Sequence, residues 1–238
     1  DEIQLCEQIA KGEADVYQIL KSYLIFLDKA NLKPNSVKQF FHAVKGYLLH
    51  LGIEIYSEKC KQYVKLPKIQ RVRKDPLTKE ILVRILSVLS LKLKTAFLVA
   101  LSSGMRIGEI AGLQLSDINF SCTPTKIRIR AEITKTREER ETYLSSEATV
   151  ILKDYLRRYF DWKEDQSNSH LKNINIFSRT SIGKYIRKDG IDEQRASVDL
   201  LQNLLHMQLK KIPELNEIGK NGRRIVHFHA LREYFYTI

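Results

Sequence analysis

Residues 93–113 read LKTAFLVALSSGMRIGEIAGL. The first nine are apolar on most faces, which predicts a helix buried inside a domain. The Ser-Ser-Gly sequence at residues 102–104 interrupts this pattern, and a second helix is expected from about Arg106 to Leu113. Within it Arg106 and Glu109 are three residues apart, so their side chains share one face. The segment therefore predicts a buried helix, a break, and an arginine at the start of the next helix.

Helical patterns also dominate the chain before this segment. Residues 16–27 carry apolar side chains at helical spacing, and so does a second stretch that ends at Gly52. The apolar stripe of that second stretch is expected to form core, and it consists of Val37, Phe40, Phe41, Val44, Tyr47, Leu48 and Leu51. After Pro76, Thr78 begins a capping box, and a helix is expected from there to about Leu89.

The hydrophobic period changes to two over residues 126–133, where apolar side chains alternate with Arg128, Arg130 and Glu132. Residues 134–139 can turn the chain and residues 140–144 can return as a partner strand, with Lys135 at or near the tip of the hairpin. Helices are expected again over residues 146–160 and 198–212. The predicted fold class is mainly α with a small β-hairpin or sheet (α+β).

The composition favours a polyanionic partner. Lysine and arginine together number 40 against 28 acidic residues, a formal net charge of +12. Such a charge suits nucleic acid or an acidic membrane surface, although a merely basic protein is an alternative. No apolar run approaches the length of a membrane span, so no membrane insertion is expected. The cysteines and histidines lack the spacing of a zinc or redox site, so the sequence predicts no metal and no cofactor.

A basic segment with two prolines, residues 65–76, lacks helical periodicity and is expected to link two domains. Its cations are candidate DNA-backbone contacts, with a solvated connector as the alternative. They are Lys65, Lys68, Arg71, Arg73 and Lys74.

Three motifs together resemble those of the tyrosine recombinases, the phage-type and Xer-type integrases. GMRIGEI at residues 104–110 resembles their first arginine motif. TKT at residues 134–136, followed by RETYL at residues 140–144, resembles their lysine hairpin. HALR at residues 229–232 resembles their H-x-L-R box. The resemblance implies a C-shaped, two-domain clamp on duplex DNA. Residues 1–66 would form a helical DNA-binding domain, 67–75 the basic linker and 76–238 the catalytic domain.

The resemblance also implies a role for each motif residue. Arg106 and Arg232 would bind non-bridging oxygens of the scissile phosphate, where negative charge accumulates. His229 would add a hydrogen bond and assist proton transfer, and Lys135 would protonate the leaving 5′ hydroxyl. Glu109 would orient the arginine or the histidine without touching substrate. The nucleophile would be a tyrosine that forms a 3′-phosphotyrosyl link, without metal or nucleotide.

Several assignments have alternatives. Lys126 or Arg137 could serve in place of Lys135, because hairpin lysines are often only solvated. His227 competes with His229, and His229 is preferred because it stands one helical turn before the second arginine. Each arginine could also serve only in an ion pair.

The family places its nucleophilic tyrosine a few tens of residues after the H-x-L-R box, whereas this sequence ends at Ile238. Tyr234 and Tyr236 are expected to belong to the core, so no nucleophile is predicted in this chain and truncation is expected.

The expected function is site-specific DNA recombination by the integrase of a mobile element, acting as a homo-tetramer on two DNA sites in the cytoplasm, at the nucleoid. The alternatives are a non-catalytic DNA-binding regulator on the same fold and a type IB topoisomerase.

Overall fold

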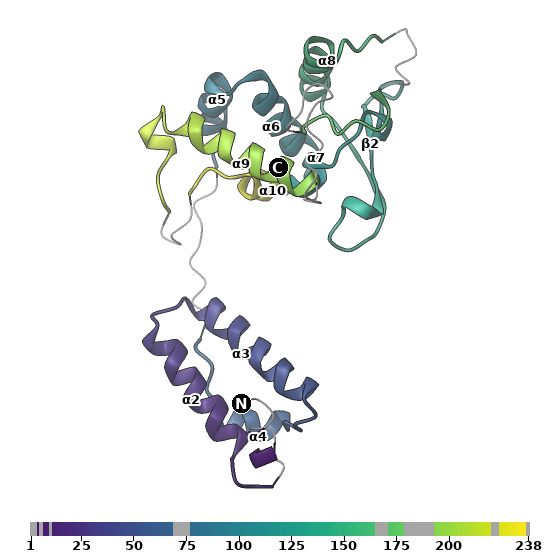
Figure 1. Cartoon of the computed structure of the whole chain (residues 1–238). Helices are drawn as coiled ribbons and strands as arrows, with labels where there is room; N and C mark the ends of the chain where they lie inside the picture. The colour runs from purple at the N-terminus through teal and green to yellow at the C-terminus, as the bar shows by residue number, and fades with distance from the viewer. Residues whose placement is uncertain are drawn as a thin grey trace. The chain divides into compact units, whose positions relative to one another are not determined.

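The computed structural model of the chain describes Gln4 and residues 7–9, 11–68, 77–164, 171–178, 193–219 and 224–236. The chain divides into two compact units, Asp1–Val72 and Arg73–Ile238 (Figure 1). Each unit has its own cluster of buried apolar side chains. The described part of the chain is mainly helical and contains a small antiparallel sheet, so the predicted fold class is confirmed.

The first unit consists of α2 (Val16–Lys29), α3 (Pro34–His50) and α4 (Ser57–Tyr63). Asp15 caps α2 by accepting a hydrogen bond from the amide of Tyr17 at 2.9 Å. The core gathers where these helices meet, around Val16, Leu20, Phe41 and Leu48.

The stripe predicted for α3 is only partly core. Val37, Phe41 and Leu48 are buried, whereas Phe40 and Tyr47 are 48% and 44% exposed. The physical reason is the size of the unit, because α2 covers one face of α3 and the edge of its wide apolar stripe stays in solvent.

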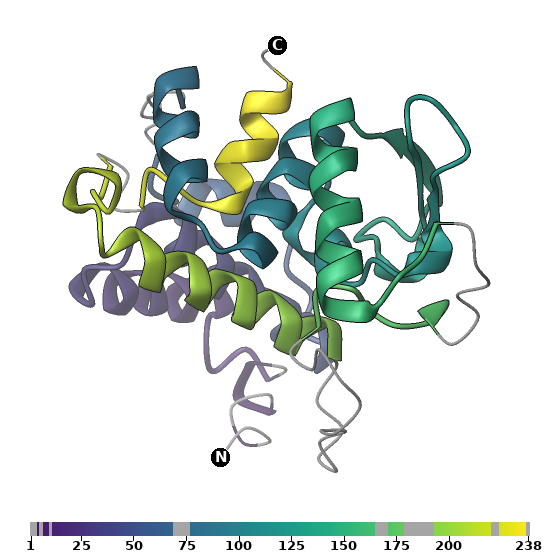
Figure 2. The ribbon, with the colours of Figure 1, turned by 90° about the horizontal axis from the view of Figure 1, so that it is seen from above.

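The second unit has α6 (Leu91–Ser103) at its centre. Nearly every side chain from Leu93 to Ala100 is buried, which confirms the predicted buried helix. It packs against α8 (Ser146–Phe160) and α10 (Phe228–Phe235) (Figure 2). The surrounding elements are α5 (Lys79–Val88), α7 (Ile107–Ala111), α9 (Glu193–Leu209), η1 (Leu115–Asp117), η2 (Ala131–Ile133) and η4 (Pro213–Leu215).

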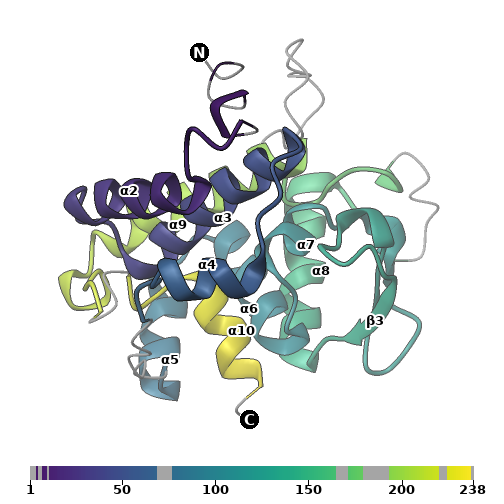
Figure 3. The same cartoon turned by 90° about the horizontal axis from the view of Figure 1, so that it is seen from below.

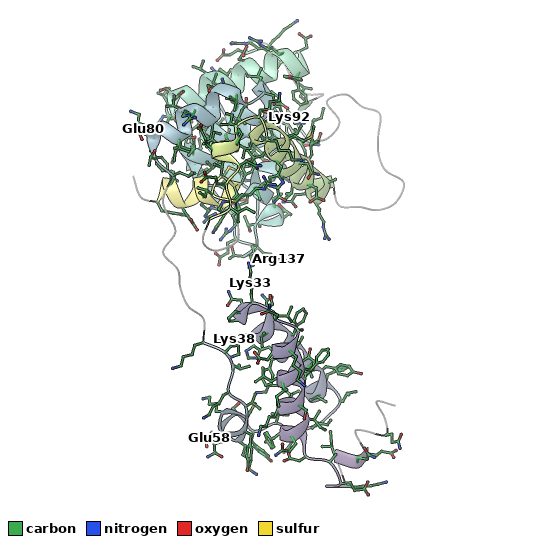
Figure 4. The ribbon with its side chains drawn as sticks, turned by 90° about the vertical axis from the view of Figure 1, so that its left-hand side faces the viewer. Lys33, Lys38, Glu58, Glu80, Lys92 and Arg137 are labelled. Atoms are coloured by element: carbon green, nitrogen blue, oxygen red, sulfur yellow. The ribbon has the colours of Figure 1, made fainter. Side chains whose placement is uncertain are left out.

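The predicted cap of α5 is confirmed. Thr78 Oγ1 accepts a hydrogen bond from the amide of Ile81 at 3.4 Å, and Glu80 lies in the first turn at the surface (Figure 4). Of the described helices, none is long and apolar enough to cross a membrane.

The sheet contains β1 (Ile118–Asn119), β2 (Lys126–Ile129) and β3 (Arg140–Tyr143), antiparallel and in that order. The predicted β2–β3 hairpin is confirmed, with Ile127 opposite Thr142.

The first hairpin strand was expected to reach Ile133, and the structure ends it at Ile129. Its successor, Arg130, turns its guanidinium onto Asp117 and the carbonyl oxygen of Gly112 (2.8 Å), and η2 follows. The strand β1 was not predicted, because two residues are too short to show a period of two.

Candidate functional site

The turn between α6 and α7 carries Arg106. It passes through Gly104, whose φ of +63° lies in the left-handed region that favours glycine. A Cβ on Gly104 would also lie 2.6 Å from Cδ1 of Phe235 in α10. Arg106 is the residue before α7, not its first residue, and its amide donates to Glu109 Oε2 at 2.8 Å. Its side chain is 41% exposed, so solvent or substrate can reach the guanidinium.

Glu109 holds two arginines with one carboxylate. Oε1 accepts from Arg106 Nη1 at 3.2 Å, and Oε2 accepts from Arg140 Nη2 at 2.6 Å. The Glu109 side chain is only 1% exposed. Burial opposes its ionisation, but the hydrogen bonds from Arg140 and Arg106 outweigh this and hold the pKa of Glu109 below its usual value. Since one carboxylate faces two guanidinium groups, the cluster keeps a net positive charge.

Helix α10 brings the H-x-L-R residues beside this turn. The helix packs on α6 (Figure 3). The ring of Phe235 lies against Gly104, two residues before Arg106. Arg232 Nη2 donates to the hydroxyl of Tyr236 at 2.8 Å. Its other terminal nitrogen, Nη1, is buried and has no hydrogen-bond partner among the described residues. The fold therefore juxtaposes the two arginine motifs.

Tyr236 does not belong to the core, contrary to the prediction. It is 66% exposed, and its ring lies 5.3 Å from the Arg232 guanidinium carbon. The reason is that α10 ends at Phe235 and the next residue leaves the packed face. Tyr234 is partly buried against the core of the second unit, as predicted.

The two histidines occupy the start of α10. His227 precedes the helix, and its Nδ1 lies 3.1 Å from the carbonyl oxygen of Ile225. His229 lies in the first turn, is 62% exposed, and has its Nε2 3.4 Å from Glu233 Oε1. The ring centroids of the histidines are 6.3 Å apart, so both rings lie near this end of the helix. His229 precedes Arg232 by one helical turn, as the sequence predicted.

Lys135 lies exposed in the connection between β2 and β3. Of its alternatives, Lys126 lies on β2 and binds Glu141 Oε1 across the sheet at 2.6 Å. Arg137 lies in the same connection as Lys135, has a φ of +56°, and projects away from the body of the second unit (Figure 4). Lys126 is thus committed to a cross-strand pair, while Lys135 and Arg137 both stay accessible.

Of the basic segment, Lys65 and Lys68 are exposed after α4. Arg71, Arg73 and Lys74 lie outside the described residues. Among the residues that the structure describes, no group of His, Cys, Asp and Glu could hold a metal ion.

Comparison with protein families matches residues 76–238, well over half of the chain, to the model of the phage integrase family. The chain belongs to the phage integrase family. The resemblance to tyrosine recombinases that the three motifs carry is thereby confirmed. The matched region contains all of Arg106, Lys135, His229 and Arg232, whose individual roles stay predictions.

Relatives of this phage integrase include the tyrosine recombinase XerA of Pyrococcus horikoshii. It is 29% identical over 99 residues, which cover 41% of this chain and 33% of XerA. The match thus spans a third of the relative's length.

Solved structures of the Tn1549 transposon integrase share the fold. A complex with circular intermediate DNA matches at a TM-score of 0.61 and 15% identity, over 93% of this chain and 71% of that chain. A complex with transposon right end DNA matches at a TM-score of 0.58 and 16% identity, over 98% and 76%.

Arg140 is the site residue to which the sequence assigned no role. It belongs to the hairpin motif, yet nothing in the local pattern distinguishes it from the exposed arginines of the same hairpin. Its contact with Glu109 joins residues 31 positions apart, and only the packing of the sheet against α7 brings them together.

Proposed function

We propose that this phage integrase is a site-specific DNA recombinase that cuts and rejoins DNA through a 3′-phosphotyrosyl intermediate. The observation that carries the proposal is the buried Nη1 of Arg232, unpartnered among the described residues, on a helix packed beside the turn of Arg106. A buried cationic donor without a partner is costly, so its presence suits a site built for an anionic oxygen. A phosphodiester supplies two such oxygens.

In this mechanism the tyrosine hydroxyl loses its proton to solvent as its oxygen attacks the phosphorus, and the bond from phosphorus to the 5′ oxygen breaks. Arg106 and Arg232 donate to the non-bridging oxygens as charge builds on them, and each such donor contributes about 3–4 kcal/mol to the transition state. His229 donates to the same phosphate, and Lys135 gives its proton to the departing 5′ oxygen. Rejoining is the reverse reaction with another DNA end.

Glu109 contributes by binding one edge of the Arg106 guanidinium and fixing its orientation. Because its carboxylate binds the guanidinium through Nη1, the other edge of that planar group can bind substrate. The carboxylate is buried, so it orients the arginine without meeting the phosphate itself.

Duplex DNA is the proposed partner. The net charge of +12 supports a polyanionic partner. The Tn1549 integrase structures are complexes with DNA, which supports DNA here. We assign DNA backbone contacts to the first helical unit and to the basic segment with Lys65, Lys68, Arg71, Arg73 and Lys74. The resemblance to tyrosine recombinases supports a two-domain clamp, a homo-tetramer on two DNA sites, and an origin in a mobile element.

The test uses a suicide DNA substrate nicked beside the cleavage position, so that the 5′ fragment diffuses away and a covalent adduct accumulates. The assay is run with this chain and with the product of the whole reading frame that encodes it. We expect an adduct that forms about 100- to 1,000-fold more slowly in Arg106→Ala and Arg232→Ala. Arg84→Ala is the matched control, because Arg84 is an arginine of the same unit, 56% exposed and paired with Glu214.

The outcomes separate the candidate functions. Tight binding of the target DNA without any adduct, in either protein, would contradict the proposal and favour a non-catalytic regulator. Relaxation of supercoiled DNA that carries no recombination site would favour a type IB topoisomerase. An adduct that forms at the wild-type rate in both arginine variants would show that Arg106 and Arg232 do not bind the scissile phosphate.

A further inference from the structure

The connection that carries Lys135 begins against α7. A Cβ on Gly112, at the end of α7, would lie 2.8 Å from Cγ2 of Ile133, so the Ile133 side chain packs closely against the backbone there. The amide nitrogen of the Gln194 side chain, from α9, donates to the carbonyl oxygen of Gly108 at 2.7 Å and to that of Ile133 at 3.4 Å. The start of the connection is thus tied to the short helix that follows Arg106.

Hydrogen bonds of the Thr134 hydroxyl close the connection into a turn at its base. Thr134 is buried, and its hydroxyl accepts a hydrogen bond from the amide of Glu138 at 3.1 Å while donating to the carbonyl oxygen of Ala131 at 3.0 Å. Lys135 lies inside this closed turn. Its backbone therefore moves with the two ends of the connection.

The far end is tied to α7 by Arg140, the first residue of β3. Its Nη2 donates to Glu109 Oε2 at 2.6 Å, and Glu109 is the residue that also holds the backbone and side chain of Arg106. Two residues further along β3, Thr142 Oγ1 donates to the carbonyl oxygen of Ser103 at 3.0 Å. Both ends of the Lys135 connection are thus anchored to the turn that presents Arg106.

The charge of Arg140 matters as well as its position. A buried carboxylate paired with Arg106 alone would cancel the charge that Arg106 brings to a phosphate. With Arg140 as a second partner of Glu109, the cluster of two arginines and one glutamate keeps one positive charge. Arg140 is 36% exposed, so it is accessible from solvent while its Nη2 is bound to Glu109.

We propose that Arg140 is a positioning residue that, through buried Glu109, fixes the Lys135 connection relative to Arg106. The inference rests on the proposed recombinase function and adds a residue to it. Arg140 need not touch the substrate. Its loss lets the connection move, so that Lys135 no longer reaches the leaving 5′ oxygen.

The test compares two substrates that differ in one atom. In the first, the scissile linkage is ordinary DNA; in the second, the bridging 5′ oxygen is replaced by sulfur. A thiol has a pKa near 8.5, so a thiolate leaves without being protonated, whereas an alkoxide requires the general acid. A substitution that only misplaces Lys135 should therefore be rescued by sulfur.

The variants, made in the product of the whole reading frame, are Arg140→Gln, Arg140→Lys and Lys135→Ala. Arg128→Gln is the matched control, because it removes the same group from the same hairpin, where Arg128 binds the exposed Glu139 at 2.7 Å. DNA affinity and the melting temperature of each variant are measured alongside, so that a loss of folding is recognised.

We expect Arg140→Gln to cleave ordinary DNA about 100-fold more slowly than the wild type, the lower range for a general acid, and to lose less than about tenfold on the sulfur substrate. Lys135→Ala should show the same two effects. Arg140→Lys should cleave ordinary DNA at a rate between those of Arg140→Gln and the wild type, and Arg128→Gln should cleave at the wild-type rate. If sulfur rescues Lys135→Ala but not a folded Arg140→Gln or Arg140→Lys, Arg140 does not position the lysine and this inference is wrong. If the wild-type product of the whole reading frame forms no adduct with either substrate, the proposed function itself fails and this inference falls with it.

Discussion

The contact between Gly104 and Phe235 gives a sharp prediction for the variant Gly104→Ala. The left-handed φ of +63° costs an L-residue about 1–2 kcal/mol. The new methyl would lie 2.6 Å from Cδ1 and 2.8 Å from Cε1 of Phe235, and such overpacking costs about 1–3 kcal/mol. Together these terms predict that the second unit loses about 2–5 kcal/mol of its free energy of unfolding.

Urea denaturation followed by tryptophan fluorescence measures this loss. Trp162 is the single tryptophan, is 5% exposed, and packs on Phe120 at a ring distance of 5.0 Å, so its emission reports unfolding of the second unit. Gly108→Ala is the control, because a Cβ there would meet Gln194 at an ordinary 3.8 Å. We expect that variant to be neutral or more stable by about 0.5–1 kcal/mol, since alanine favours a helix.

A double-mutant cycle with Phe235→Leu separates the two terms. If the ring causes the clash, the loss of unfolding free energy caused by Gly104→Ala should be smaller by about 1–3 kcal/mol in the Phe235→Leu background than in the wild type. Only the cost of the left-handed backbone conformation would then remain. A Gly104→Ala variant as stable as the wild type would refute the reasoning. So would a cycle with no coupling, because α10 would then not be held against the Arg106 turn as described.

Three further predictions concern stability. Because folding lowers the pKa of Glu109, its carboxylate contributes to the free energy of unfolding above its unfolded pKa, and this contribution is lost as pH falls through the folded pKa. The melting temperature of Glu109→Gln should therefore fall less steeply on acidification than that of the wild type. Equal slopes for the two proteins would contradict this. Asp117→Asn weakens the buried ion pair with Arg130 and should lower the free energy of unfolding, measured in urea, by about 1.5–3 kcal/mol. Glu139→Gln weakens the exposed pair with Arg128 and should lower it by less than about 1 kcal/mol. The reverse order would show that burial does not decide the cost. Thr78→Ala should cost about 1 kcal/mol and Thr78→Ser much less by the same assay, and equal costs would exclude the hydroxyl cap.

Local patterns predicted the elements whose stabilising contacts are local. The helix expected over residues 146–160 is α8 with those same limits, because periodicity and a capping serine both mark it. By contrast, α9 begins at Glu193, five residues before the apolar pattern starts at Val198. Its first turn is held by the long-range hydrogen bond from Gln194 to Gly108, which no local pattern can reveal.

The candidate site divides in the same way. The contact of Arg106 with Glu109 follows from their spacing of three residues, and the resemblance implied that Arg232 shares a site with Arg106. The Arg140–Glu109 pair and the exposure of Tyr236 depend on how β3 and α10 pack, so the sequence predicted neither. Tertiary packing thus decided the details that local pattern left open.

The central claim is that Arg106 and Arg232 stabilise negative charge on the non-bridging oxygens of one phosphate. The most direct measurement maps the cleaved phosphate and replaces it with a neutral methylphosphonate, in which that charge is absent. On ordinary DNA we expect Arg232→Ala to form the adduct about 100- to 1,000-fold more slowly than the wild type. On the methylphosphonate the deficit should shrink below about tenfold, because a methyl group replaces one non-bridging oxygen and the phosphorane carries one negative charge fewer, so the second arginine has less charge to stabilise. A deficit of the same size on both substrates would contradict the claim.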